Sequence, residues 1–358
     1  MTNGWPVKTL NQIATNLDSQ RVPITKADRV GGEYPYYGAS GIVDYVADYI
    51  FDGDTLLVSE DGANLLARST PIAFPASGKY WVNNHAHILK FDDMVTQRFV
   101  EHFFESIPLD EYITGAAQPK LNQRALNSIP IPVPPLAEQQ RIVCILDEAF
   151  EGIATAKANA EKNLQNARAL FESHLQSVFT QRGEGWVEKP LEECFRLKSG
   201  DGLTSKAMNG GSFPVFGGNG IAGMHDAFNL SGDNVIIGRV GALCGNARHI
   251  TEKIWLTDNA FRIVDRRFEF DGAFLTYLLN FRNLRSLARQ AAQPVISNSS
   301  LKDLLLRFPG IVEQKKIAAQ LESLSEETQR LATIYERKLA ALDDLKKSLL
   351  HQAFSGQL

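Results

Sequence analysis

The sequence lacks the features that would place the protein in a membrane, in the secretory pathway or in a disulfide-stabilised class. Its 358 residues include 3 cysteines, Cys144, Cys194 and Cys244, an odd number spread far apart, so neither a disulfide framework nor a metal cluster is expected. No stretch approaches the roughly 20 consecutive apolar residues of a membrane span. The N-terminus has neither the basic region nor the apolar segment of a signal peptide. We therefore expect a cytoplasmic protein with reduced cysteines and no membrane partner.

The chain also lacks the common motifs of catalysis. It has no G-x-x-x-x-G-K-[ST] loop for nucleotide hydrolysis, and no N-P-P-[FY] or D-P-P-[FY] segment of the kind with which amino-methyltransferases hold a flipped base. Residues 218–223 match the G-x-G-x-x-G dinucleotide fingerprint, but no convincing helix follows, and the related stretch 38–41 (GASG) breaks the pattern. We interpret these glycines as turn residues and expect no cofactor bound directly to this chain.

Two polar pairs could suggest a catalytic or metal site. His85 and His87 would share one face of a strand, but no other histidine or cysteine is near them, so we expect a polar pair rather than a zinc site. Glu60 and Asp61 have no carboxylate counterpart at positions 238–239 (GR) in the second half of the chain. The sequence therefore predicts no duplicated carboxylate site, no metal site and no enzyme acting by itself.

The sequence does contain a repeated helix opening. Residues 136–142 (LAEQQRI) return as residues 311–317 (IVEQKKI), and proline precedes both segments, where a helix can begin without a backbone N–H. No proline occurs inside either segment. The pattern predicts one long helix over 136–181 and another over 311–358.

Apolar residues in both predicted helices recur at alternating spacings of 4 and 3, the heptad pattern of a coiled coil. At one matching position of the two repeats the pattern has a polar residue, Asn163 in the first helix and Lys338 in the second. A leucine comes immediately after each of them, so the apolar stripe is expected to drift by one residue there. We expect the two helices, each roughly 60 Å long at about 1.5 Å per residue, to pack on each other. The predicted seam contains Ile142, Leu146, Ile153, Leu164, Leu170, Ile317, Leu321, Leu324, Leu331, Leu342, Leu345 and Leu349.

The repetition extends into the regions that precede each helix. Residues 53–58 (GDTLLV) return as 232–237 (GDNVII), and Trp81 matches Trp255. The chain is therefore a tandem repeat of a globular unit followed by a long helix. Its apolar triplets predict short buried strands entered from a Gly-Asp turn, at 56–58 and 235–237, and helices are expected over 97–106 and 270–290.

These observations predict a mixed α/β protein with two diverged globular domains and two helices. The expected boundaries are 1–135 for the first domain, 136–181 for the first helix, 182–310 for the second domain and 311–358 for the second helix. The two domains share turn and core residues but differ nearly everywhere else. Such a pair would present different loops on one scaffold.

Charge is distributed unevenly between the two domains. The first 137 residues hold 15 acidic and 10 basic side chains, which argues against unaided non-specific binding to nucleic acid, because phosphate neutralisation drives such binding. The predicted loops nevertheless carry arginine, which reads guanine, and asparagine or glutamine, which read adenine. For each residue alone, a solvated or turn-capping role is the alternative. The candidate DNA-contacting residues are Arg21, Lys26, Arg29, Tyr36, Ser40, Asn64, Gln118, Lys120, Asn122, Lys206, Asn219, Arg239, Arg248, Asn259, Gln293 and Asn298.

This architecture resembles the specificity subunits of Type I restriction-modification systems. The resemblance is carried by the opening PPLAEQQRI at 134–142 and its echo PGIVEQKKI at 309–317. It is strengthened by the Trp and Leu that open each unit, the Tyr-Gly and Phe-Gly turns, and the Gln-Pro ahead of each helix. It covers the full chain.

The resemblance implies two target-recognition domains separated by two helices that pack as an antiparallel coiled coil with pseudo-two-fold repetition. Each domain would read one half of a split, asymmetric site in double-stranded DNA. The helices would set the gap and dock two methyltransferase subunits, and through them restriction subunits. S-adenosylmethionine, ATP and Mg²⁺ are expected on those partners, not on this chain. The alternative is a coiled-coil adaptor with two protein-binding domains, but loops rich in arginine, asparagine and glutamine favour DNA over a protein partner.

Overall fold

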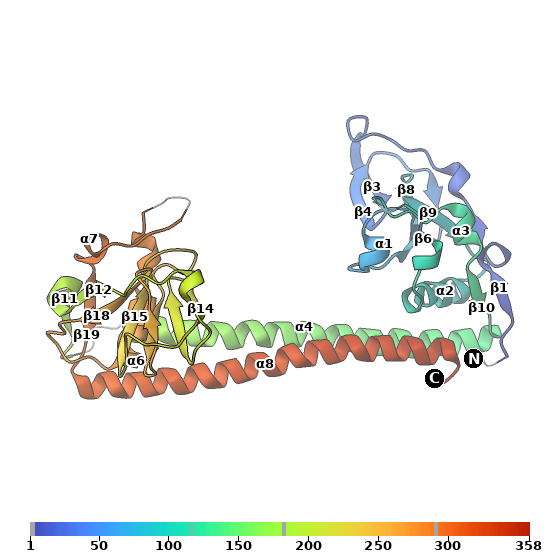
Figure 1. Ribbon diagram of the computed structural model, residues 1–358. Helices are drawn as coiled ribbons and strands as arrows, with labels where there is room; N and C mark the ends of the chain where they lie inside the picture. Colours follow the sequence, from blue (N-terminus) through green and yellow to red (C-terminus); the bar gives the residue numbers. More distant parts are fainter. Residues whose placement is uncertain (1–3, 116, 181–183, 290–292) are drawn as a thin grey trace. The chain divides into compact units, whose positions relative to one another are not determined.

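The computed structural model describes residues 4–115, 117–180, 184–289 and 293–358. The chain divides into two compact units (Figure 1). Unit 1 comprises Met1–Glu161 with Arg337–Leu358, and unit 2 comprises Lys162–Glu336. Each unit therefore combines one globular part with a segment of both long helices. Within the described residues, no helix has the length and apolar character needed to cross a membrane.

The globular part of unit 1 contains three small sheets and short helices. The first sheet has the order β2 (Thr15–Asn16), β9 (Ala86–Lys90), β6 (Thr55–Ser59), β7 (Ala73–Ala76), with every neighbour antiparallel. The second has the order β4 (Gly41–Val46), β3 (Gly31–Gly38), β8 (Lys79–Val82), β5 (Phe51–Asp52), in which β3 and β8 are parallel. The third pairs β1 (Val7–Thr9) with β10 (Pro130–Pro132), and the helices are α1 (Asn64–Ala67), α2 (Met94–Ser106) and α3 (Gln123–Asn127).

The core of unit 1 forms around β6 and α2. All five residues of β6 are buried, as expected for a short apolar strand with neighbours on both edges. The side chain of Asp93 caps α2 by accepting a hydrogen bond from the N–H of Thr96 at 2.7 Å. Phe99 and Phe103 of this helix pack edge-on against Phe354, near the end of the chain. The end of the second long helix is therefore part of the unit 1 core.

Unit 2 repeats this topology strand for strand in its principal sheet. The order is β12 (Arg196–Ser199), β18 (Ala260–Val264), β15 (Asn234–Gly238), β16 (Ala247–Ile250). The second sheet has the order β14 (Gly220–His225), β13 (Phe213–Gly217), β17 (Trp255–Leu256), and the third pairs β11 (Val187–Pro190) with β19 (Leu305–Phe308). The helices are α5 (Leu191–Cys194), α6 (Gly272–Phe281) and α7 (Asn298–Leu301). The duplication inferred from the sequence is thus confirmed as a duplication of fold.

The predicted helix over 270–290 was too long. Helix α6 ends at Phe281, and Asn283 has a left-handed backbone with φ of 46°, which an α-helix does not accommodate. A short 3-10 turn follows, and residues 290–292 lie outside the described part of the chain. In contrast, α2 contains the whole of the helix that the sequence predicted there.

The glycines of the G-x-G-x-x-G match form a β-hairpin. Gly217 pairs with Gly220, so the two residues between them make the turn, and Gly220 has a φ of 101° that suits glycine. Gly223 lies within β14. The interpretation as turn residues is confirmed at the hairpin but not at Gly223, which is a strand residue.

The two long helices, α4 (Leu136–Thr180) and α8 (Ile311–Ser355), have 45 residues each. The predicted last residue of the first, Gln181, lies outside the described residues. Both begin with the same contact: the side-chain amide of Gln139 donates to the carbonyl of Pro134 at 2.9 Å, and that of Gln314 donates to the carbonyl of Pro309 at 2.9 Å. The glutamine of the repeated Glu-Gln pair is buried in both copies. It therefore fixes the turn from the proline into the helix.

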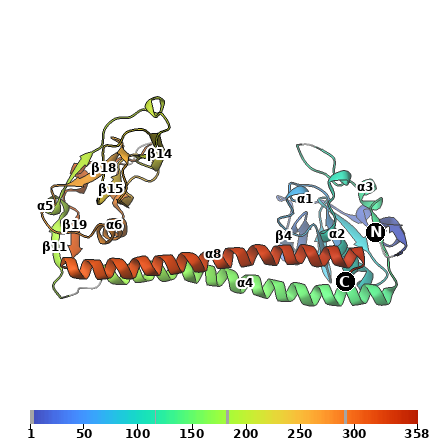
Figure 2. The ribbon, with the colours of Figure 1, turned by 60° about the horizontal axis from the view of Figure 1, so that its bottom comes forward.

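Within each unit the two helix segments run antiparallel and side by side (Figures 1 and 2). In unit 1, Lys157 forms an ion pair with Asp343. In unit 2, the Arg168 guanidinium lies 2.9 Å from a carboxylate oxygen of Glu336. These pairs are exposed, so they contribute little to stability.

Most of the predicted seam is buried or half-buried, but two of its leucines are not. Leu170 and Leu345, which match each other in the repeat, are 52% and 47% exposed. The stripe drifts by one residue after the polar steps, because an α-helix has 3.6 residues per turn and a heptad repeat only 3.5. Phe171 and the stem of Lys346 take the inward positions instead.

Candidate nucleic-acid interface

Loops at one end of unit 1 are tied together around Glu60, the residue that follows β6. Its N–H donates to the carbonyl of His85 at 2.9 Å, and its carbonyl accepts from the N–H of Leu121 at 2.8 Å. The hydroxyl of Ser59 donates to the β3–β4 turn. These bonds hold four segments in one loop cluster. We define the unit 1 loop cluster as residues 39–40, 60–63, 83–85 and 118–122.

The same bonds recur in unit 2 around Arg239, which follows β15. Its N–H donates to the carbonyl of Asn259 at 2.9 Å, and its carbonyl accepts from the N–H of Ile296 at 2.9 Å. Gly238 lies so close to the carbonyl of Gly218 that a Cβ there would be only 2.4 Å from that oxygen. The hairpin turn is thus pressed against the end of β15. We define the unit 2 loop cluster as residues 218–219, 239–243, 257–259 and 293–298.

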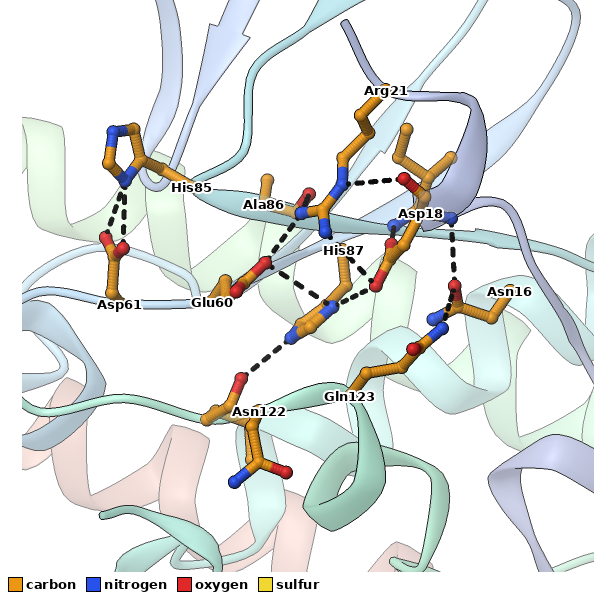
Figure 3. Close-up of polar contacts among 12 residues, drawn as sticks. Asn16, Asp18, Arg21, Glu60, Asp61, His85, Ala86, His87, Asn122 and Gln123 are labelled. Carbon is orange, nitrogen blue, oxygen red and sulfur yellow. Dashed lines mark hydrogen bonds and ion pairs between the residues drawn. The ribbon is translucent and has the colours of Figure 1, made fainter. Parts of the chain in front are cut away.

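Behind the unit 1 loop cluster lies a network of ion pairs (Figure 3). A guanidinium nitrogen of Arg21 lies 2.6 Å from Glu60 Oε2, and Lys120 Nζ lies 3.1 Å from Glu60 Oε1. His87 Nδ1 lies 2.5 Å from Asp18 Oδ2, in a fully buried position. Two carboxylates and their partners therefore connect the 3-10 turn after β2, the end of β6 and β9 to the 118–122 segment.

His87 connects Asp18 to the 118–122 segment. Its second nitrogen, Nε2, donates to the carbonyl oxygen of Leu121 at 2.7 Å, because that oxygen can only accept. Its Nδ1 faces the carboxylate of Asp18.

The network also sets the ionisation of its carboxyl groups. Burial alone would raise the pKa of Asp18, but the hydrogen bond and charge of His87 outweigh it and hold that pKa below its ordinary value. Burial likewise opposes ionisation of Glu60, and hydrogen bonds from Arg21 and Lys120 together with the charge of His87 lower its pKa overall. Both groups are therefore ionised at neutral pH.

Asp18, Glu60 and His87 place potential metal-ligand atoms within 4.8 Å of one another. A metal ion would need a lone pair on a histidine nitrogen, but Nε2 of His87 donates to the carbonyl of Leu121 and Nδ1 is occupied by its contact with Asp18. Arg21 and Lys120 also supply the positive charge that an ion would bring. We therefore assign these residues to an ion-pair network that supports the loop cluster rather than to a cation site.

Strand register identifies the counterparts of this network in unit 2. Val58 pairs with His87, and Ile237 pairs with Phe261. By the same register, Ser199 corresponds to Asp18, Arg239 to Glu60, Phe261 to His87 and Val295 to Lys120. The sequence comparison that set Glu60-Asp61 against positions 238–239 was wrong by one residue. The backbone is conserved between the units, while Asp18, Glu60, His87 and Lys120 are each replaced by a different residue type.

The structure distributes the unit 1 candidates over three environments. Ser40, Gln118 and Lys120 belong to the loop cluster, and Arg21 lies in the network behind it. Asn122 caps α3 by accepting from Ala125, and Asn64 is bound to the loop at 69–70, so both have structural partners. On the β3–β4 hairpin, Tyr36 is buried beneath Arg29, which pairs with Asp44, while Lys26 is exposed nearby.

In unit 2, five of the candidates lie in the loop cluster: Asn219, Arg239, Asn259, Gln293 and Asn298. The amide of Asn298, however, donates to the carbonyl of Leu197 at 3.2 Å. Arg248 lies on β16 beside the hairpin glycine Gly220, and Lys206 is exposed on a short 3-10 turn.

The prediction that His85 and His87 share a strand face is wrong. His85 precedes β9 and binds Asp61 at 2.9 Å on the surface, whereas His87 points into the network (Figure 3). Asp18 was not identified from the sequence, because only the pairing of β2 with β9 brings it to His87. The Glu60-Asp61 pair directly after a buried strand was the available signal for this site.

Known proteins share both the sequence pattern and the fold. The family model described as the Type I restriction modification DNA specificity domain matches residues 2–165 and again residues 183–336. A Haemophilus influenzae protein assigned as a type I restriction enzyme specificity subunit is 38% identical over 140 residues, 39% of this chain and 36% of that one. The EcoprrI specificity subunit of Escherichia coli is 30% identical over 208 residues, 56% of this chain and 51% of that one. The matched stretches thus span about a third and a half of these relatives.

Solved structures extend the comparison to the whole fold. The HsdS subunit from Thermoanaerobacter tengcongensis superimposes with a TM-score of 0.61 at 17% identity, covering 100% of this chain and 98% of that one. A chain from a structure that describes complex assembly and conformational transition of the type I R-M system gives 0.72 at 18% identity, covering 99% of both chains. At these identities the likeness establishes the fold. With two matches of the family model along one duplicated chain, this protein belongs to the family of Type I restriction-modification DNA specificity subunits.

Proposed function

We propose that this chain is the DNA-recognition subunit of a Type I restriction-modification complex, in which each unit reads one half of a split, asymmetric site. The observation that carries the proposal is the pair of loop clusters: identical backbone bonds hold them, and their side chains differ. Two diverged copies of one scaffold suit two different half-sites. An adaptor with two protein-binding units has no comparable support in the family match.

The side chains of the loop clusters fit readout in the major groove. Lys120 in unit 1 and Arg239 in unit 2 are donors, and Gln118, Asn219 and Asn259 offer amides that can donate and accept. The acidic composition of the first 137 residues requires that other subunits contribute much of the contact with phosphates. We assign that role to two methyltransferase subunits docked on this chain.

The long helices fit the role of a spacer. Each is 45 residues long with no internal proline, so each spans roughly 68 Å at about 1.5 Å per residue. A rigid spacer fixes the number of unread base pairs between two half-sites, because the two readers must keep the phase of the DNA turn. S-adenosylmethionine would bind to the methyltransferase subunits, and ATP and Mg²⁺ to restriction subunits docked through them, so that methyl transfer and cleavage take place outside this chain.

Selection from random DNA tests the proposal directly. The full chain, co-purified with its methyltransferase subunits, is incubated with a random duplex library, and the bound DNA is sequenced. We expect two short, different motifs separated by a constant gap. A continuous motif, a palindromic motif or no enrichment would contradict the proposal, and capture of proteins without DNA selectivity would favour the adaptor.

The spacer role needs its own experiment. Four residues, about one helical turn, are inserted into α4 after residue 161 and into α8 after residue 336. We expect the gap between the motifs to lengthen and both motifs to stay the same. A change in either motif, or an unchanged gap with intact binding, would contradict the spacer role while leaving recognition itself in place.

A further inference from the structure

The side chain of Arg239 has an environment unlike that of its counterpart in unit 1. Glu60 is neutralised by two cations at 2.6 and 3.1 Å. Arg239 has no carboxylate within 4 Å among the residues that the structure describes, and its Nε is buried without a hydrogen-bond partner. Its Nη1 makes only long contacts, 3.3 Å to the carbonyl of Asp258 and 3.5 Å to the hydroxyl of Ser199. A half-buried guanidinium is thus left with unused donors.

The position of Arg239 is nevertheless well fixed. Its backbone is bonded on both sides, to Asn259 and Ile296, directly after the buried strand β15. The guanidinium carbon lies 5.4 Å from the ring centroid of Phe261, close enough for a cation–π contact that orients the group. The guanidinium group, with its parallel N–H donors, is thus held at the end of a rigid strand and is preorganised for a ligand with two acceptors.

Besides the exposed Asp258, whose carbonyl Arg239 contacts, the neighbours of Arg239 in the loop cluster carry neutral amides. Asn219, Asn259 and Gln293 are exposed in the same loop cluster. The side-chain oxygen of Asn219 accepts from the N–H of Leu243 at 2.9 Å, which leaves its NH₂ group as a donor. The cluster therefore presents amide donors beside the guanidinium of Arg239, a combination that suits a ligand edge with two acceptors.

Comparison of the two units shows whether the ligand of Arg239 is a base or a phosphate. Every half-site offers the same phosphates, so a phosphate-binding position would need a cation in both units. The equivalent position in unit 1 holds Glu60. Its charge is opposite, and both of its carboxylate oxygens are already paired with cations. The residue type at this position therefore differs between the two units, as expected for a residue that contacts a base in two different half-sites.

We propose that Arg239 reads a guanine in the half-site of unit 2 through a bidentate contact to O6 and N7. This inference rests on the proposed function, because it requires that unit 2 faces the major groove. It names the reading residue and the base class, neither of which follows from membership of the family. Good bidentate pairs contribute about 1–3 kcal/mol of discrimination, equivalent to about 5- to 150-fold in affinity for the correct base.

The test compares variants of the full chain in complex with its methyltransferase subunits. Arg239→Gln removes the guanine contact, and Arg239→Lys keeps the charge but loses the fork. Arg196→Gln, on β12 of the same unit and exposed, is the matched control. Bound motifs are obtained by random-library selection, and the melting temperature of each complex checks its integrity.

We expect Arg239→Gln to lose preference for guanine at one position of one half-site, by about 5- to 150-fold, and Arg239→Lys, which keeps a donor but not the planar fork, to lose part of it, while the other half-site and the control stay unchanged. An unchanged motif in both variants would overturn the inference. A uniform loss of affinity with the same motif in Arg239→Gln, restored in Arg239→Lys, would also overturn it, by making Arg239 a phosphate contact. A wild-type complex without any motif would instead reject the proposed function.

Discussion

Glu60 and Arg239 occupy the same position in the two repeats and have opposite charges. Each follows the central buried strand of its unit, and in each the backbone N–H and carbonyl make the same pair of hydrogen bonds. The scaffold that holds the residue has been kept, while its surroundings have changed from an ion-pair network to an aromatic ring and neutral groups. This is the pattern expected where one fold is used twice to recognise two different ligands.

The ion-pair network predicts that Glu60→Ala destabilises unit 1 selectively. The substitution removes the nearer carboxylate of the mostly buried Arg21, which keeps only the longer contact of 3.6 Å to Asp18, and this costs up to about 3 kcal/mol. Hydrogen exchange of peptides from β6 and β9 should accelerate, and exchange in β15 and β18 should not. Glu111→Ala, an exposed residue of the same unit, is the control and should leave both unchanged. Equal acceleration in both units would contradict the assignment.

Acid should weaken unit 1 through the same groups. The pKa of Asp18 is lower in the folded chain than in the unfolded one, so its contribution is present above the unfolded value of about 3.9 and is lost as pH falls through the folded value. Asp18→Asn should therefore be less stable than wild type at pH 7, with a difference that shrinks as the pH falls below about 4. Hydrogen exchange of β9, corrected for intrinsic rates, measures the difference in stability between the two proteins. A difference that grows as the pH falls would contradict the prediction.

The buried glutamines that open the long helices should differ in importance. Gln139 donates one hydrogen bond, to Pro134, and its oxygen is buried without a partner. Gln314 makes three, with Pro309, with the carbonyl of Glu269 and with the N–H of Asp271. We expect Gln139→Leu to cost about 1 kcal/mol and Gln314→Leu about 3 kcal/mol.

Calorimetry of the two glutamine variants provides the comparison. The larger drop in melting temperature should belong to Gln314→Leu, because it leaves two carbonyls and one N–H unpaired. Equal drops in the two variants would show that the shared proline contact, rather than the number of bonds, determines the contribution, and a larger drop for Gln139→Leu would contradict the prediction.

The drift of the helix seam can be tested with neighbouring residues. Phe171 packs against Tyr277 with ring centroids 6.1 Å apart, and Leu170 is exposed. Phe171→Ala should cost about 2 kcal/mol, and Leu170→Ala, the matched control, less than about 0.5 kcal/mol. Exchange protection of α6 reports the difference. The reverse order would place Leu170 in the seam and contradict the drift.

Much of the fold could be predicted because the chain carries it twice. The repeated Glu-Gln opening and the Gly-Asp entry to a buried strand each identified an element that the structure contains, in both copies. The drift at the polar steps was predictable from the leucines that follow them, but Leu170 and Leu345 were wrongly kept in the seam beyond those steps. The length of α6 was overestimated because nothing in its composition indicates the left-handed Asn283.

The site was less accessible from sequence. Asp18 and His87 are 69 residues apart, and only their strands bring them together. Polar residue types alone could not separate Asn219, which faces the loop cluster, from Asn122, which caps a helix, because both amides suit either role. The one-residue error in matching Glu60 to the second repeat also hid the charge reversal at Arg239. Register, which the ladder of hydrogen bonds defines, was the missing information.

The most direct test of the account is a map of methylated DNA in cells that carry this chain with its methyltransferase subunit. Single-molecule sequencing is applied to cells with the wild-type chain and with a chimaera in which residues 182–310 come from another member of the family. We predict a split asymmetric motif in the first, and in the second a motif that changes in one half and keeps the other half and the gap. A wild-type complex that leaves no motif, or a chimaera that changes both halves, would contradict the claim that each unit reads one half-site.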